Sequence, residues 1–556
     1  MSQLVVPPRG PMAGQMMPQQ FNLWRLVEYA GTFHPHIEVV AQALEGPAER
    51  SNWAGVLHRS RCLAAGLLKF GVTPDWRIAS LAWNTLDHLL LHYAVTGLGA
   101  PLHTLNPRLT ADDLAYMAAL VDDDVCCFDA GTADLARDLA ALDTPIRCWI
   151  FMGDGEPAHA AAFPGLVYLR DIIAADDAGF SWPDFDENRA AVVCFTSGTT
   201  GRPKGVAYSH RSLTLTAMAM TMAEMYGGQI EGEPTCVLPI AAMFHSNAWL
   251  MPFSAPMNGH KLVLPGRRLD GANVVDLVLA EGVTMAAGVP TVWNDVIREL
   301  DRRGIATTML NTALVSGTPM PPTTAAALLA HGIRPRQSWG MTECPGTARG
   351  ALPWGTAGLD AEAQAELFVA RQGRVGFHAR VRIVDEQGTV LPHDGVTPGN
   401  LEVSGPTVLS RYLGEPESAA REWLETGDIA RIYPDSTFAI VDRAKDVIKS
   451  GGEWISSPLL EAAALAHPAI RAAAAIAMPD PRWQERPLLV CVLEDGAEPP
   501  SDEELREFMA GFVARWWLPD AFRYVAALPM TTTGKVNKAG LRTQIADTAE
   551  PGATSA

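Results

Sequence analysis

"CFTSGTTGRPKG", Cys194 to Gly205, is the stretch from which the rest of the chain is best interpreted. It contains three glycines, three threonines, a serine and a lysine, and it overlaps the end of the apolar run Ala190 to Phe195. An apolar run bounded by turn residues is typical of a buried strand that leads into a loop. Backbone amides in such a loop can approach phosphate oxygens closely, and the lysine adds positive charge. The stretch therefore predicts a phosphate-binding loop, with a flexible surface hairpin as the alternative.

The Walker A loop is the first phosphate-binding motif to compare. In that motif four residues separate a glycine from a Gly-Lys pair, and a serine or threonine that binds magnesium follows the lysine. Here only Arg202 and Pro203 separate Gly201 from Lys204, and Gly205 follows the lysine. The Walker A interpretation is therefore excluded.

Length and composition indicate a folded protein with several units. A chain of 556 residues corresponds to roughly three to four domains of typical size. The apolar fraction of 48% and the charged fraction of 19% are typical of a globular enzyme. The net charge of −19 repels nucleic acid phosphates and anionic membranes. We therefore expect no nucleic-acid partner.

The cysteines and the N-terminal stretch favour a cytoplasmic protein. Eight cysteines are scattered through apolar segments without a C-x-x-C pair, as expected for reduced core residues. The first residues, up to Trp24, are broken by prolines and lack the continuous apolar core of a signal peptide. No other run is a clean transmembrane span. We expect a cytoplasmic location and no transmembrane segment.

The chain is organised as a large and a small domain. From Leu23 to about Phe438, short apolar runs alternate with helix-length segments, which predicts parallel α/β layers. A charged stretch with paired glycines at residues 440–457 indicates a linker. After it, a helix, an apolar run, a strand and a helix capped by Ser501 and Glu504 predict a small α+β domain of about a hundred residues. The expected boundaries are disordered ends at 1–20 and 544–556, a large domain at 21–440, a hinge at 441–446 and a small domain at 447–543.

Three further motifs follow in order along the chain. They are "SWGMTECPG" at Ser338–Gly346, "ETGDIARIYPDSTFAIVDRAKDVIKSGGEWIS" at Glu425–Ser456 and "PMTTTGKVNKAGLR" at Pro529–Arg542. With these motifs the sequence resembles the adenylate-forming superfamily of acyl-CoA synthetases, firefly luciferase and nonribosomal peptide adenylation domains. The stretches "FHSNAWLMPFSAPMNGHKLVLPG", "AAGVPTVW", "IKSGGEWISS" and "DPRWQERPLLV" are similar to bacterial medium- and long-chain fatty acyl-CoA synthetases, and equally to methylmercaptopropionate-CoA ligases.

The resemblance implies both a fold and a reaction. The fold would be α/β, with a large N-terminal domain of layered α/β subdomains and a barrel-like part, and a small mobile α+β C-terminal domain. The reaction would be an AMP-forming acid–thiol ligation that uses ATP, Mg²⁺ and coenzyme A, with a homodimer as one option for the assembly. The acid would be a medium- or long-chain fatty acid, or alternatively methylmercaptopropionate or an aryl or short-chain acid. A luciferase-like or adenylation-only enzyme and an inactive binding module are further alternatives.

The same resemblance assigns residues to ATP. The loop that would cradle the β- and γ-phosphates consists of Thr196, Ser197, Gly198, Thr199, Thr200, Gly201 and Lys204. Glu343 and Thr196 would hold Mg²⁺, because a hard divalent ion prefers oxygen ligands. The base and sugar would lie against Gly317, Thr318, Ser338, Trp339, Gly340, Met341, Thr342, Asp428 and Arg443. Trp339 would stack on adenine where the family usually has tyrosine, and Asp428 would accept both ribose hydroxyls.

The remaining assignments concern the acid and the second step. His245 would line the carboxylate site, and Trp249 would close the acyl tunnel until ATP binds, although such residues are more often packing residues. Lys535 would stabilise charge on the α-phosphate. Lys445 matches the hinge position, and Gly451 and Gly452 would line the pantetheine tunnel. The methionines of the helix after the phosphate loop are expected in the core: Met218, Met220, Met222 and Met225.

Two positions depart from the family pattern. Ser316-Gly317-Thr318-Pro319 stands where the family has Gly-Gly-x-Ala, so the depth of the acyl pocket does not transfer by analogy. Ser436 stands where a turn glycine is common, so we expect a different turn there.

Overall fold

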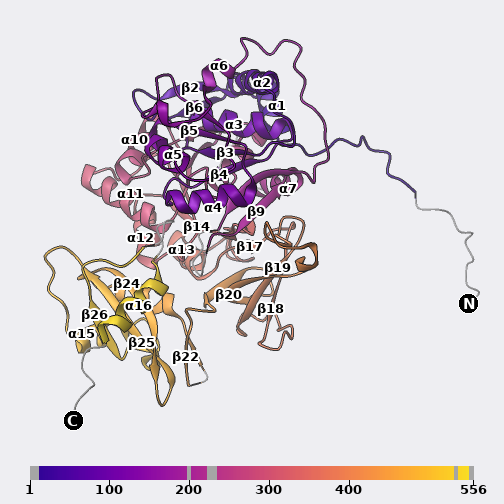
Figure 1. The fold of residues 1–556 in the computed structure, drawn as a ribbon. Coiled ribbons are helices and arrows are strands. Elements are labelled where there is room, and N and C mark those ends of the chain that lie inside the picture. Colours follow the sequence, from indigo (N-terminus) through magenta and orange to yellow (C-terminus); the bar gives the residue numbers. More distant parts are fainter. Residues whose placement is uncertain (1–11, 197–201, 222–233, 452, 531–535, 550–556) are drawn as a thin grey trace, which may run out of the picture.

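Two seven-stranded sheets form the larger part of the molecule (Figure 1). The computed structural model describes residues 12–196, 202–221, 234–451, 453–530 and 536–549. The first sheet has the order β7 (Leu166–Tyr168), β6 (Cys148–Met152), β5 (Val125–Asp129), β3 (Ile78–Leu81), β4 (Leu102–Leu105), β8 (Ala190–Phe195) and β9 (Gly205–Ser209). The second has the order β14 (Arg334–Gln337), β13 (Thr312–Val315), β12 (Met285–Gly288), β10 (Cys236–Pro239), β11 (Lys261–Leu264), β1 (Glu38–Ala41) and β2 (Glu49–Asn52). All neighbours are parallel except the edge strands β9 and β2, which confirms the predicted parallel layers.

Helices connect and cover these sheets. Their bounds are α1 (Trp24–Phe33), α2 (Trp53–Phe70), α3 (Leu86–Gly97), α4 (Ala111–Val121), α5 (Ala133–Ala140), α6 (Leu169–Ile172), α7 (His210–Met220), α8 (Ser246–Trp249), α9 (Met251–Met257), α10 (Gly271–Glu281), α11 (Pro290–Arg303), α12 (Pro322–Ala330) and α13 (Ala361–Ala370). Helix α3 is buried at every residue except Asp87, which explains why its sequence is apolar around most of its surface. Within the described ranges, no helix has both the length and the apolar composition that a membrane span requires.

The expected barrel-like part consists of two antiparallel sheets. One contains β15 (Trp339–Met341), β16 (Cys344–Arg349) and β17 (Arg374–Val375), and the other contains β18 (Arg380–Val384), β19 (Gly399–Ser404), β20 (Leu424–Ile432) and β21 (Phe438–Arg443). A bridge between Arg374 and Thr437 connects them, and the strands do not close into a barrel within the described chain. Ser436 has a φ of 63°. Because this is the left-handed conformation that favours glycine, the expectation of a different turn is wrong.

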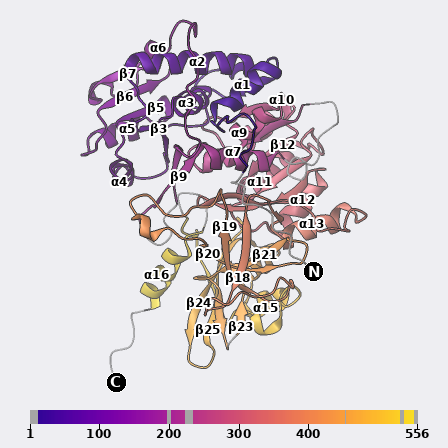
Figure 2. The ribbon, with the colours of Figure 1, turned by 90° about the vertical axis from the view of Figure 1, so that its right-hand side faces the viewer.

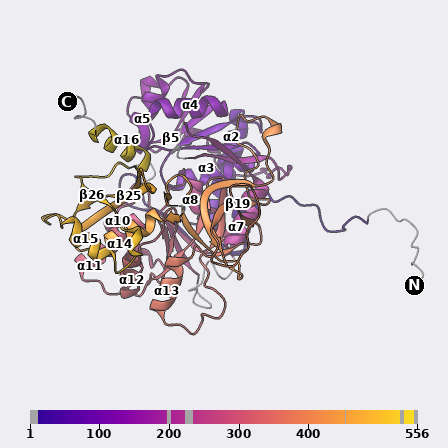
Figure 3. The same cartoon turned by 90° about the horizontal axis from the view of Figure 1, so that it is seen from below.

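The C-terminal unit is a small α+β fold, as predicted. Its strands are β22 (Ile448–Ser450), β23 (Glu453–Ile455), β24 (Ile470–Asp480), β25 (Gln484–Leu493) and β26 (Ala521–Tyr524), and its helices are α14 (Ser457–Leu465), α15 (Asp502–Met509) and α16 (Lys538–Ala549). Ser501 caps α15 by accepting the Glu504 N–H at 3.2 Å. Helix α16 runs six residues past 543, so the expected tail from 544 begins inside this helix. Figure 2 shows this unit below the parallel sheets, and Figure 3 shows it beside the β19 region.

Helix α16 ties the C-terminal unit to the connection that follows β21. Arg542 pairs with Asp446 at 2.7 Å and also donates to the Lys445 carbonyl. Lys538 pairs with Glu461 of α14 at 2.6 Å. Asp442, at the end of β21, accepts the Ser457 N–H at 2.7 Å. The junction between the two parts is therefore a polar network rather than an apolar core.

Asp442 gives this junction a pH dependence. It is 2% exposed, and burial raises the pKa of its carboxyl from 3.8 to about 6, although nearby Lys538 lowers it. Because the folded pKa lies above the unfolded one, the contribution to stability is complete below pH 4 and is lost as the pH rises through about 6. The loss is at most about 3 kcal/mol. We expect Asp442→Asn to remove this part of the pH dependence when the free energy of unfolding is measured from pH 4 to 7. A difference between parent and variant that does not change with pH would contradict this assignment.

Candidate active site

One cavity of about 1690 Å³ lies where the parallel sheets, the β15–β16 hairpin and the C-terminal unit meet. Its lining includes residues that directly follow parallel strands: Asn106 after β4, Thr196 after β8, Ile240 after β10, Val289 after β12, Ser316 after β13 and Ser338 after β14. In open α/β sheets, ligands bind outside the carboxyl ends of the strands. The volume exceeds the roughly 300–1,000 Å³ of a pocket for one small ligand, so the cavity has room for more than one substrate.

The predicted phosphate loop is the turn of the β8–β9 hairpin. The Thr196 N–H donates to the Lys204 carbonyl at 3.0 Å, and the Lys204 N–H donates to Thr196 Oγ1 at 3.2 Å. Both residues line the cavity. The predicted residues Ser197, Gly198, Thr199, Thr200 and Gly201 lie outside the described residues. Strands β8 and β9 pair on either side of the loop, and the residues that bound the loop line the cavity. The phosphate-binding loop and the flexible surface hairpin both stay predictions.

Glu343 lies opposite this hairpin, in the turn between β15 and β16. Its side chain is buried and lines the cavity. The Tyr412 hydroxyl donates to Oε1 at 2.7 Å. No group of three or more histidine, cysteine, aspartate or glutamate side chains forms a metal cluster in the described part of the chain. Glu343 offers a carboxylate and Thr196 a hydroxyl to the same cavity. Oxygen donors of this kind fit a hard ion that takes few protein ligands and completes its shell with phosphate and water.

Trp339 and Asp428 form a hydrogen-bonded pair that the sequence did not reveal. The indole Nε1–H donates to Asp428 Oδ2 at 3.0 Å, and Arg443 pairs with Oδ1 at 2.9 Å. Asp428 is 3% exposed and does not itself line the cavity, whereas Trp339 and Arg443 do. The other predicted base and sugar residues line the cavity as well: Gly317, Thr318, Ser338, Gly340, Met341 and Thr342. Trp339 lacks the phenolic hydroxyl of the tyrosine in the family pattern, but its indole N–H is a hydrogen-bond donor to Asp428.

His245 precedes a left-handed turn, and Trp249 lies within it. Five successive residues other than glycine, Ser246 to Leu250, have φ values between 41° and 61°. This conformation costs an L-residue about 1–2 kcal/mol, and strained backbone is concentrated at functional sites. His245 and Trp249 both line the cavity. The sequence predicted that His245 and Trp249 lie at the site. It did not predict the left-handed backbone of residues 246–250.

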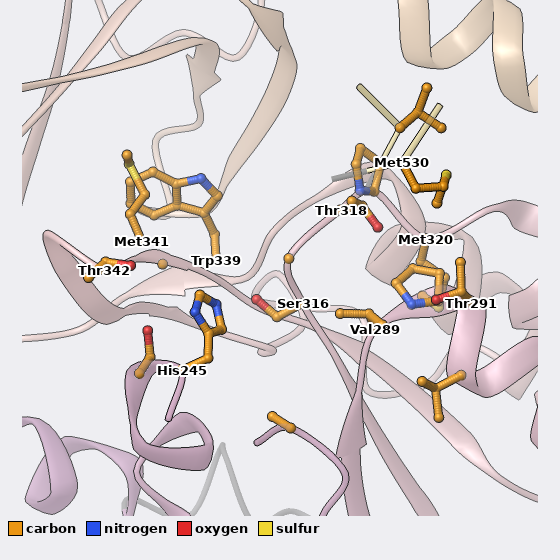
Figure 4. Close-up of a pocket in the computed structure, with 18 of the residues that line it drawn as sticks. His245, Val289, Thr291, Ser316, Thr318, Met320, Trp339, Met341, Thr342 and Met530 are labelled. Atoms are coloured by element: carbon orange, nitrogen blue, oxygen red, sulfur yellow. The ribbon is translucent and has the colours of Figure 1, made fainter. Parts of the chain in front are cut away.

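Figure 4 shows how the side chains divide the cavity. His245, Ser316, Trp339 and Thr342 gather at one end, and Val289, Thr291, Thr318 and Met320 at the other. Met530 and Val536 of the C-terminal unit also line it. Lys535, between these two, lies outside the described residues.

The residues that the resemblance assigns to the hinge and to the pantetheine tunnel do not all line the cavity. Lys445 lines the cavity, and burial lowers its pKa. Gly451 does not line the cavity. It lies in the C-terminal unit, where its N–H donates to the Trp483 carbonyl at 2.8 Å. Gly452 lies outside the described residues.

The cysteine and methionine predictions are confirmed in part. All eight cysteines are free, as expected, and seven of them are buried. Met220 is buried, but Met218 is 45% exposed because it lies on the outward side of α7, so the core prediction is wrong for Met218. Met222 and Met225 lie outside the described residues.

Sequence reasoning missed Tyr412 altogether. This residue lines the cavity and contacts Glu343, yet it lies 69 positions away along the chain. The sequence offered one signal for this residue, namely an aromatic side chain within the charged run "SRYLGEPE". This run lies between the end of β19 and the start of β20. An aromatic residue in a polar loop often has a specific partner.

Comparison with known proteins finds relatives over nearly the whole chain. The family model described as "AMP-binding enzyme" matches residues 28–413, and that described as "AMP-binding enzyme C-terminal domain" matches residues 459–535. The chain is 39% identical over 546 residues to the 3-methylmercaptopropionyl-CoA ligase of Ruegeria lacuscaerulensis, covering 96% of this chain and 99% of that relative. It is also 39% identical over 546 residues to the medium-chain-fatty-acid–CoA ligase of Ectopseudomonas oleovorans, covering 96% and 98%.

A solved structure supports the same fold. The anthranilate CoA ligase AuaEII in complex with anthranoyl-AMP has a TM-score of 0.82, with 96% of this chain and 99% of that chain covered. Its sequence identity is 20%, so this likeness concerns the fold alone.

The Trp339–Asp428 hydrogen bond leads to a prediction for nucleotide binding. Trp339→Phe keeps an aromatic plane but removes the donor to the carboxylate. Because a hydrogen bond to a charged group contributes about 1.5–3 kcal/mol, we expect ATP to bind about tenfold more weakly or worse, as measured by isothermal titration calorimetry. A folded variant that binds ATP as tightly as the parent would show that the indole N–H has no part in holding the sugar site.

Proposed function

The chain belongs to the family of AMP-binding enzymes, and from this premise we propose that it is an AMP-forming acid–CoA ligase that activates an apolar carboxylic acid. The observation that carries the proposal is the single cavity that brings Thr196, Lys204 and Glu343 together with the Trp339–Asp428 pair. Relatives named as CoA ligases, each 39% identical over nearly the full chain, support the same reaction.

The proposed acid is aliphatic, either a medium- or long-chain fatty acid or a methylthio acid such as 3-methylmercaptopropionate. The names of the two relatives state different acids, so the names alone do not distinguish a fatty acid from a methylthio acid as the substrate. Apolar side chains in the cavity lining include Val289 and Met320, which lie at one end with Thr291 and Thr318, and also Ile240 and Leu250. Each methylene of the acid that an apolar lining removes from water makes the free energy of binding more favourable.

The first step forms an acyl-adenylate. A carboxylate oxygen attacks the α-phosphorus of ATP, the bond from that phosphorus to the bridging oxygen breaks, and pyrophosphate leaves. Preorganised cations that face the developing charge lower such a barrier most, and we assign this role to Lys535, with Lys204 on the outer phosphates. Glu343 and Thr196 would hold Mg²⁺, which when bound supplies charge neutralisation on the phosphates.

The second step transfers the acyl group to coenzyme A. The thiolate sulfur attacks the carbonyl carbon, and the bond to AMP breaks. Met530 and Val536 form part of the cavity wall, so the thiol needs a different position of the C-terminal unit. We assign the hinge to Lys445 and the pantetheine path to Gly451 and Gly452, because domain rotation is a common way to assemble two catalytic arrangements in turn.

Two other candidates stay open to test. An adenylation-only enzyme would release pyrophosphate without forming a thioester, and an inactive binding module would do neither. The expected domain boundaries, the homodimer and the cytoplasmic location stay predictions.

A series of acids tests the proposed function. We expect AMP release and thioester formation with aliphatic acids, with kcat/KM rising about fourfold for each methylene until the cavity is filled, since a buried methylene contributes about 0.8 kcal/mol. AMP is measured by a coupled assay and thioester by mass spectrometry. A dicarboxylate or an amino acid that outperforms every fatty and methylthio acid would contradict the apolar substrate class.

Lys535 should separate the two steps. Removing one preorganised cation typically lowers the rate by about a hundred- to a thousandfold, so Lys535→Ala should cripple pyrophosphate release from acid and ATP. With chemically prepared acyl-adenylate and coenzyme A, we expect thioester at nearly the parent rate, because the rotated C-terminal unit has carried the lysine away. An equal loss in both assays would mean that Lys535 serves both steps or stabilises the fold.

A further inference from the structure

A short segment of main chain joins the two sides of the phosphate site. This bridging segment, Leu409–Leu413, follows β19 and runs from Glu343 to the phosphate-loop hairpin. The Leu409 N–H donates to the Glu343 carbonyl at 2.8 Å, and the Leu413 N–H donates to the Gly205 carbonyl at 2.9 Å. Gly205 directly follows Lys204, so one segment of five residues fixes the backbone of both groups.

Tyr412 makes the same connection through its side chain. Its hydroxyl donates to Glu343 Oε1 at 2.7 Å, and the Lys204 ammonium lies 4.8 Å from the centre of its ring. Arg421 lies 5.5 Å from the same ring. A cation near an aromatic face is attracted by the ring, so the tyrosine contacts both a carboxylate and a lysine that line the cavity.

The surroundings of Tyr412 hold it in this orientation. Its N–H donates to Glu415 Oε2 at 2.8 Å, and the same carboxylate pairs with Arg421 at 3.0 Å. The phenol lies partly buried against the Glu343 carboxylate. It is the donor in this contact, because an ionised carboxylate offers only acceptor oxygens.

We propose that Tyr412 is a positioning residue for the metal–triphosphate group: its hydroxyl holds the Glu343 carboxylate through Oε1, and its ring lies beside Lys204. The oriented carboxylate would then hold the metal, and the lysine would supply positive charge to the phosphates. The proposal rests on the proposed function for the identity of the ligand. A carboxylate held by an outer hydrogen bond needs no reorientation when it binds a metal, and loss of such a partner typically weakens metal affinity about ten- to a hundredfold.

Metal binding measured without the acid tests this role. Mn²⁺ replaces Mg²⁺ as the probe, and its binding to the full-length enzyme with saturating ATP is followed by electron paramagnetic resonance. We expect Tyr412→Phe, which keeps the ring near Lys204, to bind Mn²⁺ about tenfold more weakly than the parent. Tyr524→Phe is the matched control, because it removes a hydroxyl that donates to the Pro500 carbonyl at 2.8 Å within the C-terminal unit. Parent-like Mn²⁺ affinity in Tyr412→Phe would overturn the proposal.

A double-mutant cycle distinguishes positioning from a general structural role. If the hydroxyl acts through Glu343, adding Tyr412→Phe to Glu343→Gln should change Mn²⁺ affinity little, because the carboxylate that it positions is already gone. Additive losses would overturn the proposal. Equal losses of Mn²⁺ affinity in Tyr412→Phe and Tyr524→Phe would do the same.

The outcome is independent of the acid. Should the parent form no thioester with any acid, the proposed function fails, while Mn²⁺–ATP binding and its dependence on Tyr412 are still measured directly. Should thioester form while Tyr412→Phe binds Mn²⁺ like the parent, only the positioning role fails.

Discussion

The carboxyl ends of parallel strands from two different sheets open into one cavity, and the rest of the site depends on this constraint. Strands β4 and β8 of one sheet and β10, β12, β13 and β14 of the other each deliver the next residue to its lining. Parallel strands all point the same way, so their loops collect at one edge and are free of sheet pairing. Loops placed this way can expose backbone amides to phosphate on one side and apolar side chains to an acid on the other.

The C-terminal unit completes this cavity by polar contacts. Arg542 pairs with Asp446, which follows β21, and the Ser457 N–H donates to Asp442 within β21. A polar junction of this kind exchanges hydrogen bonds with water at modest net cost, whereas an apolar interface of the same size resists separation. The junction is therefore compatible with the proposed rotation of the C-terminal unit between the two steps.

The sequence predicts the local elements well and the long-range contacts poorly. The run Ala190–Phe195 and its loop are readable because an apolar strand and a glycine-rich turn are encoded by neighbouring residues. The bonds from Trp339 to Asp428 and from Tyr412 to Glu343 join residues 89 and 69 positions apart, and only the packed fold brings them together. The left-handed turn at Ser246–Leu250 opposes local preference, so tertiary contacts must impose it. Ser436 was mispredicted for the same reason, because serine adopts there a conformation that its own preference disfavours.

Acid-dependent exchange of labelled pyrophosphate into ATP, measured without coenzyme A, tests the central claim most directly. The cavity is interpreted as a site where an acid and ATP react reversibly before the thiol enters. We expect exchange that requires an aliphatic acid, with ATP as the only nucleotide labelled. Exchange that proceeds equally without acid, or formation of ADP in place of pyrophosphate, would contradict it.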